Sequence, residues 1–274
     1  MAITLNGTTG ITTPALDSSG PLTSLGIDDN ATSTAITIDA SQNVGIGTSS
    51  PQAKLHIVSH ANQEPMTLQA TTDGYSYITY KNSAGADVAY TGLGGGAAVV
   101  TGTTADYAIR ATANLLFGAG SSSERMRIDS SGAVTMPYQP AFLAQPTSNQ
   151  VDIPASITVT VVFGTEVFDQ NADFASNTFT APVTGKYQLN YSLYLTNIDT
   201  AAAYYEVELK TSIKSYSFVI DPNFASDLNY LTLTQSVLAN MDAGDTAYVT
   251  IRQQTGTAQT DISNISFFSG YLVA

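Results

Sequence analysis

The 274-residue chain has no cysteine and no tryptophan, and only 11% of its residues are charged. The absence of cysteine excludes disulfides, thiol catalysis and cysteine-ligated zinc. Nine basic residues stand against 22 acidic ones, which gives a net charge of −13. Proteins that bind nucleic acid place clustered basic side chains against phosphate, so no nucleic-acid partner is expected.

Long apolar runs are also missing. No stretch approaches the ~18 to 20 apolar residues that cross a bilayer, so no membrane insertion is expected. The first ten residues, MAITLNGTTG, have neither the basic nor the apolar region of an export signal. What the chain does contain is 43% hydrophobic residues, including 10 Phe and 15 Tyr, among many uncharged polar residues. This composition is typical of a folded, β-rich protein, and the length allows two domains of ordinary size.

The first 139 residues consist of short apolar pieces separated by Gly, Ser, Thr and Pro, with no helical periodicity. One weak repeat aligns residues 38–44 (IDASQNV) with residues 128–134 (IDSSGAV), and both copies are expected to form strand, turn and strand. Small isolated hairpins are marginally stable in water, so these strands are expected to need partners from another chain. An elongated, intertwined β-rich stalk follows, and a flexible linker is the alternative.

Beyond Pro137 the predicted strands lengthen and alternate strictly. Tyr187, Leu189 and Tyr191 alternate with polar residues, as do Tyr205, Val207 and Leu209. A period of two with one apolar face indicates half-buried antiparallel strands. About eight such strands in the second half predict a two-sheet β-sandwich of the jelly-roll type.

The second half resembles the C1q-like globular head, a trimeric jelly roll related to the tumour-necrosis-factor fold. The matching segments are Pro140–Ala144, Phe168–Phe174, Asn177–Tyr187 (NTFTAPVTGKY), Leu238–Val249 and Phe267–Leu272 (FFSGYL). The resemblance implies a homotrimer with aromatic side chains at or near the threefold axis. The residues expected at this interface are Phe142, Tyr187, Tyr191, Phe267, Phe268 and Tyr271.

The first half resembles tail-fibre and other appendage proteins of phages. Residues 43–57 (NVGIGTSSPQAKLHI) and residues 124–132 (ERMRIDSSG) are similar to two elements that occur in the trimeric shafts of those proteins. The resemblance implies a protein on the surface of the phage particle with three parts: a virion-docking segment (1–16), a stalk (17–139) and a C1q-like head (140–274). Docking on other virion proteins, in the tail, baseplate or capsid, is assigned to Ile3, Leu5 and Ile11.

These two resemblances predict a non-enzymatic, trimeric tail fibre or receptor-binding protein that attaches to a glycan or protein of the host cell surface. The alternative is a capsid decoration (cement) protein or head fibre that stabilises the capsid. Carbohydrate recognition combines aromatic faces with amides and carboxylates, so the expected receptor contacts lie in three loops. They are Asn197, Asp199, Tyr204, Asp221, Asn223, Phe224, Gln254 and Thr255.

No catalytic, cofactor or metal site is predicted. His56 and His60 are spaced for zinc only on a helix, and their segment is expected to be a strand and loop. Glu206 and Glu208 could imitate a glycosidase pair, but are expected to face water. The glycines of residues 92–96 precede no helix that could hold a phosphate. Asp169, Asn171 and Asp173 alternate like calcium ligands without completing a known calcium loop, and calcium binding stays open.

Overall fold

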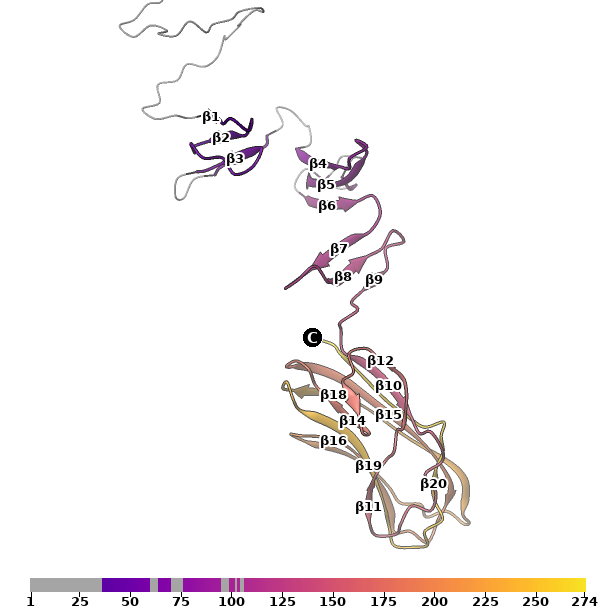
Figure 1. Ribbon diagram of the computed structural model, residues 1–274. Coiled ribbons are helices and arrows are strands. Elements are labelled where there is room, and N and C mark those ends of the chain that lie inside the picture. The colour runs from indigo at the N-terminus through magenta and orange to yellow at the C-terminus, as the bar shows by residue number, and fades with distance from the viewer. Residues whose placement is uncertain (1–35, 60–63, 70–75, 95–98, 102, 104–105) are drawn as a thin grey trace, which may run out of the picture. The chain divides into compact units, whose positions relative to one another are not determined.

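The computed structural model describes residues 36–59, 64–69, 76–94, 99–101, 103 and 106–274. All regular structure in these residues is β-strand, which confirms the predicted all-β class (Figure 1). Within the same residues, no helix has the length and hydrophobicity needed to cross a bilayer. The predicted docking residues Ile3, Leu5 and Ile11 lie outside the described residues.

The C-terminal half forms two six-stranded sheets, as the alternation predicted. The order of the first sheet is β12 (Thr165–Asp169), β10 (Ala141–Gln145), β21 (Phe267–Leu272), β15 (Gly185–Ile198) and β18 (Leu228–Met241), with β20 (Asp261–Ile262) also paired to β15. The order of the second sheet is β13 (Phe174–Ala175), β14 (Thr178–Thr180), β19 (Thr246–Gln254), β16 (Tyr204–Thr211) and β17 (Ser215–Ile220), with β11 (Thr158–Thr160) also paired to β19. Except for the parallel bridge between Ala155 and Gln253, pairing within the sandwich is antiparallel.

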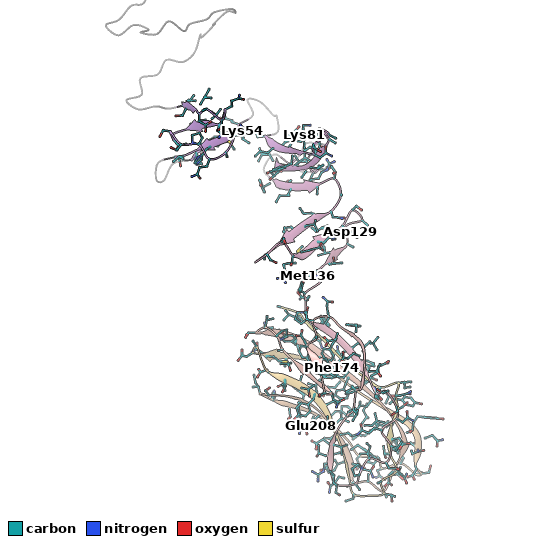
Figure 2. All side chains as sticks on the ribbon, viewed as in Figure 1. Lys54, Lys81, Asp129, Met136, Phe174 and Glu208 are labelled. Carbon is teal, nitrogen blue, oxygen red and sulfur yellow. The ribbon has the colours of Figure 1, made fainter. Side chains whose placement is uncertain are left out.

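The core of the sandwich lies between the two sheets. In β15 every second residue from Tyr187 to Leu195 is fully buried, and the residues between them are only partly covered. Phe142 is at the centre of an aromatic cluster, stacked on Phe174 at 4.9 Å and on Phe179 at 4.8 Å between ring centroids (Phe174 is labelled in Figure 2). Gly270 faces this cluster, and a Cβ atom there would lie 2.8 Å from the Phe142 ring, so only glycine lets the last strand pack so closely.

The described part of residues 36–135 forms three separate three-stranded sheets. The first contains β1 (Ile36–Ile38), β2 (Val44–Ile46) and β3 (Leu55–Ile57). The second contains β4 (Tyr77–Lys81), β5 (Asp87–Leu93) and β6 (Tyr107–Ala111). The third contains β7 (Leu115–Gly118), β8 (Glu124–Ile128) and β9 (Val134–Thr135).

The predicted repeat is confirmed as a repeated turn. In the β1–β2 hairpin, Oδ1 of Asp39 accepts backbone N–H groups from two and four residues later, at 2.8 and 2.9 Å. Asp129, which is labelled in Figure 2, makes the same two contacts in the β8–β9 hairpin, again at 2.8 and 2.9 Å. The fourth residue of each turn, Gln42 or Gly132, has a positive φ of 61° or 91°. Each carboxylate thus fixes a five-residue reversal of the chain.

A third copy of this turn joins β4 and β5, and the sequence pattern did not reveal it. Oδ1 of Asn82 accepts the N–H groups of Ala84 and Ala86, both at 3.0 Å, and Gly85 has a φ of 80°. The flanking residues hide the similarity. Lys81 and Asp87 form an ion pair where the other two hairpins carry an isoleucine and a valine.

Candidate functional site at the loop end of the sandwich

The sandwich has a chain-connection end and a loop end. At the connection end, the Lys186 N–H at the start of β15 donates to the carbonyl of Ala274 at 2.7 Å, and the Gln139 side chain donates to the Leu272 carbonyl at 2.9 Å. Strand β15 runs from there to Ile198, so the loop that follows it lies at the opposite end. Three loops meet at this loop end: residues 199–203, 221–227 and 255–261.

The segment entering the sandwich is fixed at the connection end. The Gln170 side chain donates to the carbonyl of Met136 at 2.8 Å, and the Asn171 side chain donates to the carbonyl of Tyr138 at 3.0 Å. The guanidinium carbon of Arg125 lies 4.3 Å from the centroid of the Tyr138 ring. The incoming chain is therefore bound at the connection end, and the loop end lies at the other end of β15.

Asp199 is a structural clamp, and its prediction as a receptor contact is wrong. Its residue is only 4% exposed. Its carboxylate accepts the backbone N–H groups of Ala201, at 2.8 Å, and of Thr257. A Cβ atom at Gly256, which has a φ of +80°, would lie 2.2 Å from Oδ2 of Asp199. The Asp199 carboxylate therefore joins two loops, and its burial leaves no surface for a ligand to contact.

A buried pair of hydroxyl groups holds Asp199 in place. The hydroxyl groups of Tyr205 and Thr260 lie 2.6 Å apart, and the Tyr205 hydroxyl also accepts the N–H of Asp199 at 3.0 Å. Gln253, which is fully buried, donates to the carbonyl of Thr257 at 2.8 Å. Burial raises the pKa of the Tyr205 hydroxyl.

Asp227 ties the remaining loop into the group. Its Oδ1 accepts the N–H and the hydroxyl of Thr200, at 2.9 and 2.6 Å, and its Oδ2 accepts the side chain of Gln259 at 3.0 Å. The hydroxyl of Thr200 is the main cause that holds the pKa of the Asp227 carboxyl below its ordinary value. The Asp227 carboxylate thus connects all three loops, and no sequence motif predicted this role.

The other predicted contacts fall into two groups. Asp221, Asn223 and Phe224 are exposed in one loop, and Phe224 keeps 42% of its surface. Asn197 is also exposed, but its amide donates to Asp261 at 3.0 Å. The structure brings these four residues to the loop end, where they remain predictions as ligand contacts. Thr255 lies there as well: its hydroxyl donates to the Gln254 carbonyl at 2.6 Å and accepts the N–H of Ala203 at 3.1 Å.

Tyr204 and Gln254 border these loops, at the ends of β16 and β19 on the outer face of the second sheet. They are cross-strand neighbours of β16 and β19, and both are half-buried. The same face carries Glu206 and Glu208, which are also half-buried rather than fully exposed to water. Glu208 is ion-paired with Lys210 at 2.8 Å. The lysine holds this carboxylate on the surface of the sheet.

Four of the six predicted interface residues belong to the interior of a single protomer, and this prediction is corrected. Phe142, Tyr187, Tyr191 and Phe268 are at most 1% exposed. Their side chains point between the two sheets, where the Tyr187 hydroxyl donates to the carbonyl of Val183 at 2.7 Å. No surface of these rings is left for another copy to contact.

Tyr271 and Phe267 face the other side of the first sheet. Tyr271 is 49% exposed, and Phe267 is half-buried. Tyr271 lines an open hollow of about 380 Å³ together with Leu143 and with Phe168, which is also 49% exposed. Asn190 and Ser269 also line the hollow, and its lining contains no charged residue.

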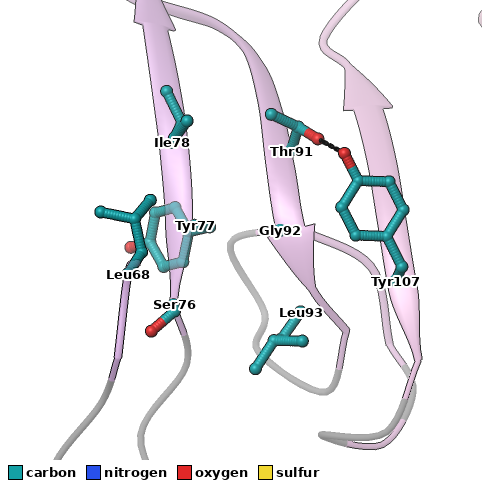
Figure 3. A pocket seen from close by; sticks show the side chains of 8 residues that line it. All are labelled: Leu68, Ser76, Tyr77, Ile78, Thr91, Gly92, Leu93 and Tyr107. Carbon is teal, nitrogen blue, oxygen red and sulfur yellow. Dashed lines mark hydrogen bonds between the residues drawn. The ribbon is translucent and has the colours of Figure 1, made fainter. Parts of the chain in front are cut away.

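A second hollow, of about 240 Å³, lies in the second small sheet. Figure 3 shows the hydroxyl groups of Thr91 and Tyr107, 2.5 Å apart, beside the apolar side chains that line the hollow. Position 92 requires glycine, because a Cβ atom there would lie 2.3 Å from the carbonyl oxygen of Ser76. The glycine serves close strand packing. Gly95, Gly96 and His60 lie outside the described residues.

The possible calcium ligands have separate structural tasks. The carboxylate of Asp169 accepts the N–H groups of Asp173 at 3.0 Å and of Phe174 at 2.9 Å, and Asn171 reaches the connecting segment. Burial, with the neighbouring Asp169 carboxylate, raises the pKa of Asp173. Across the part of the chain that the structure describes, no group of three His, Asp or Glu side chains is placed to hold a metal ion.

The family model described as "C1q domain" matches residues 141–273. The C-terminal half is a C1q-like jelly roll. Among solved structures, the chain is similar to the globular domain of zebrafish complement 1qA protein, at 20% identity and a TM-score of 0.39, covering 50% of this chain and 98% of that one. Murine APRIL at pH 8.0 shares 11% identity with a TM-score of 0.37, covering 49% of this chain and 99% of that one. No curated protein matches the chain.

The C1q match agrees with the resemblance predicted from the second half of the sequence. C1q-like and tumour-necrosis-factor-like domains commonly form trimers and are typically non-enzymatic. The match does not extend to residues 1–140, where the resemblance to phage appendages and the boundaries at residues 16 and 139 stay predictions.

Proposed function

We propose that the chain is a non-enzymatic, homotrimeric structural protein of a phage particle, and that it attaches the particle to a glycan or protein of the host surface. The N-terminal segment would dock on other virion proteins, the small sheets would form the stalk, and the C1q-like domain would be the head. The two sequence elements shared with phage appendages, at residues 43–57 and 124–132, support the phage assignment.

The observation that carries attachment is the division of the head into a connection end and a loop end. The connecting segment is bound at one end of the sandwich, whereas three loops are tied together at the other by Asp199 and Asp227. A surface that is rigid before binding loses less entropy when a ligand docks. Asp221, Asn223 and Phe224 offer a carboxylate, an amide and an aromatic ring there, which are the groups that recognise carbohydrate.

Trimerisation would strengthen such binding without any further contacts. Three heads present three copies of the loop end, and weak contacts to a repeated surface ligand gain avidity when they engage together. The apolar outer surface around Tyr271, Phe168 and Leu143 supports self-association of the head, because these side chains stay partly exposed in one copy.

The test uses intact particles of the phage that encodes the chain. Gold-labelled antibodies against the head should mark a few sites at the tail in electron micrographs, and the same antibodies as monovalent fragments should block adsorption to host cells. Labelling of many sites over the capsid, with adsorption unaffected, would overturn attachment in favour of the capsid-decoration alternative.

A further inference from the structure

The outer face of the second sheet of the sandwich carries a broad set of polar side chains. Every second residue of β16 faces outward, because the residues between them, such as Tyr205 and Val207, are fully buried. Residues paired across strands share a face. The outward rows are Tyr204 with Gln254, Glu206 with Arg252, Glu208 with Thr250 and Lys210 with Tyr248, extended by Thr158 and Thr160 of β11 and by Ser215, Ser217 and Val219 of β17. We name this set of residues the polar platform.

Two of the four charged side chains of the polar platform satisfy each other. The ammonium of Lys210 lies 2.8 Å from the carboxylate of Glu208. That carboxylate also accepts the hydroxyl of Ser217 at 3.4 Å and that of Thr250 at 3.5 Å. The hydrogen bond with Glu208 is the main cause that raises the pKa of the Lys210 ammonium. Glu208 and Lys210 therefore belong to a network that is complete within the chain.

The other two charged side chains, Glu206 and Arg252, are cross-strand neighbours and are both half-buried. Within the residues that the structure describes, no ion pair joins them. Nε of Arg252 donates to the side chain of Gln254 at 2.9 Å, which fixes the direction of the guanidinium. The two terminal nitrogens of Arg252 and the carboxylate of Glu206 make no hydrogen bond to any described residue. A fork of donors and a pair of acceptors thus lie side by side, available to a ligand.

The chemistry of the polar platform restricts what can bind there. Its two carboxylates, one ammonium and one guanidinium give it no net charge, in a chain whose net charge is −13. An acidic polymer would meet the Glu206 carboxylate beside every contact with Arg252. A protein partner would need an apolar centre without charges, and Val219 is the one aliphatic side chain of the platform. An uncharged carbohydrate fits, because its hydroxyl groups donate to a carboxylate and accept from a guanidinium.

Aromatic rings stand at both ends of the polar platform. Tyr204 is in the row next to Glu206 and Arg252, about 7 Å along the strand, where its negative ring face can pack on the C–H groups of a sugar. Tyr248 is at the other end, roughly 20 Å from Tyr204 along the strand, so the platform is long enough for several linked sugars. The hollow at Tyr271 belongs to the first sheet, so self-association there leaves the platform open.

We propose that the polar platform binds an uncharged oligosaccharide, with Glu206 accepting from and Arg252 donating to neighbouring sugar hydroxyl groups, and with a sugar ring packed on Tyr204. Because Tyr204 and Gln254 border the loops, the binding surface continues from the loop end onto the sheet. The inference rests on the proposed attachment to the host surface. It names the class of ligand and the residues that select it.

The test measures binding of the full-length protein to an array of immobilised glycans that contains uncharged mannans, glucans and galactans beside sialylated and uronic-acid glycans. We expect binding to uncharged glycans. The variants E206Q and R252K should each weaken this binding at least about tenfold, because each removes hydrogen bonds to a charged group. Y204A should weaken it as well, whereas Y204F keeps the ring and should bind normally. The matched control is E166Q, at an exposed glutamate of β12 in the other sheet, and it should bind normally.

An unchanged melting temperature of E206Q and R252K shows that the sheet is intact, so that their loss of binding reports on the ligand. Binding to acidic glycans alone, or to no glycan of the array, would overturn the inference. Binding to an uncharged glycan that survives E206Q and R252K but is lost in F224A would also overturn it, because the ligand would then lie at the loop end, and the proposed function would stand. Antibodies against the head that leave adsorption of the particles unchanged would instead overturn the proposed attachment, whatever the array shows.

Discussion

Replacement of Phe142 by alanine separates a core role from an interface role. The ring is 1% exposed and contacts Phe174, Phe179 and Phe268 at 4.8 to 5.0 Å between centroids. Phe→Ala changes in protein cores cost about 3 to 5 kcal/mol, and three aromatic contacts place this site at the upper end. With a denaturant slope of about 2 kcal/mol per molar urea, the unfolding midpoint should fall by roughly 2 M.

The assay is urea unfolding followed by tyrosine fluorescence, with light scattering of the folded variant. Measurements at several protein concentrations are needed, because the stability of an oligomer depends on concentration. The control is Y271A, which removes a half-exposed ring and should cost about 1 kcal/mol within the protomer while weakening association. A folded F142A protein that dissociates without losing stability would refute the placement of Phe142 in the core.

Three further changes test the loops and the turns. G256A should destabilise the loop end by about 1 to 3 kcal/mol, seen as a lower melting temperature, because its φ is +80° and its Cβ would meet Asp199. D227A should speed hydrogen exchange in the two loops bound to that carboxylate, while exchange in the small sheets is unchanged. Hydrogen bonds from the turn lower the pKa of the Asp129 carboxyl. The ionised carboxylate therefore stabilises the fold above the ordinary pKa of about 3.9, and this stabilisation is lost as the pH falls through the lower pKa of the folded state. The variant D129N should remove this acid dependence but keep the turn, because Asn82 makes the same turn in the second sheet. The variant D129A should loosen the turn at neutral pH. An unchanged acid transition in D129N would contradict the assignment.

The sandwich could be predicted from the sequence because strict alternation leaves few alternatives. Residues such as Leu189 and Val207 recur with a period of two, and a strand with one apolar face must pack on another sheet. The alternation does not say which face meets which neighbour. Phe267 and Phe268 are adjacent, yet one lies outside and the other inside the sandwich, and only the pairing of β21 with β15 decides between them.

The candidate site was only partly predictable. Polar residues in loops are usually exposed, which favoured Asp199 as a ligand contact. Its burial depends on Tyr205, which is close in sequence, and on Gly256, which is distant in sequence and meets Asp199 only in the folded domain. The turn at Asn82 was missed for a related reason: the backbone geometry of the repeat is preserved there, while its apolar flanking residues are not.

The central claim is that the chain completes its fold by threefold self-association, and its most direct test is the mass of the full-length protein in solution. Light scattering coupled to size exclusion should give three times 28.7 kDa, unchanged on dilution to the lowest concentration that can be measured. A single, stable species of 28.7 kDa would contradict the account.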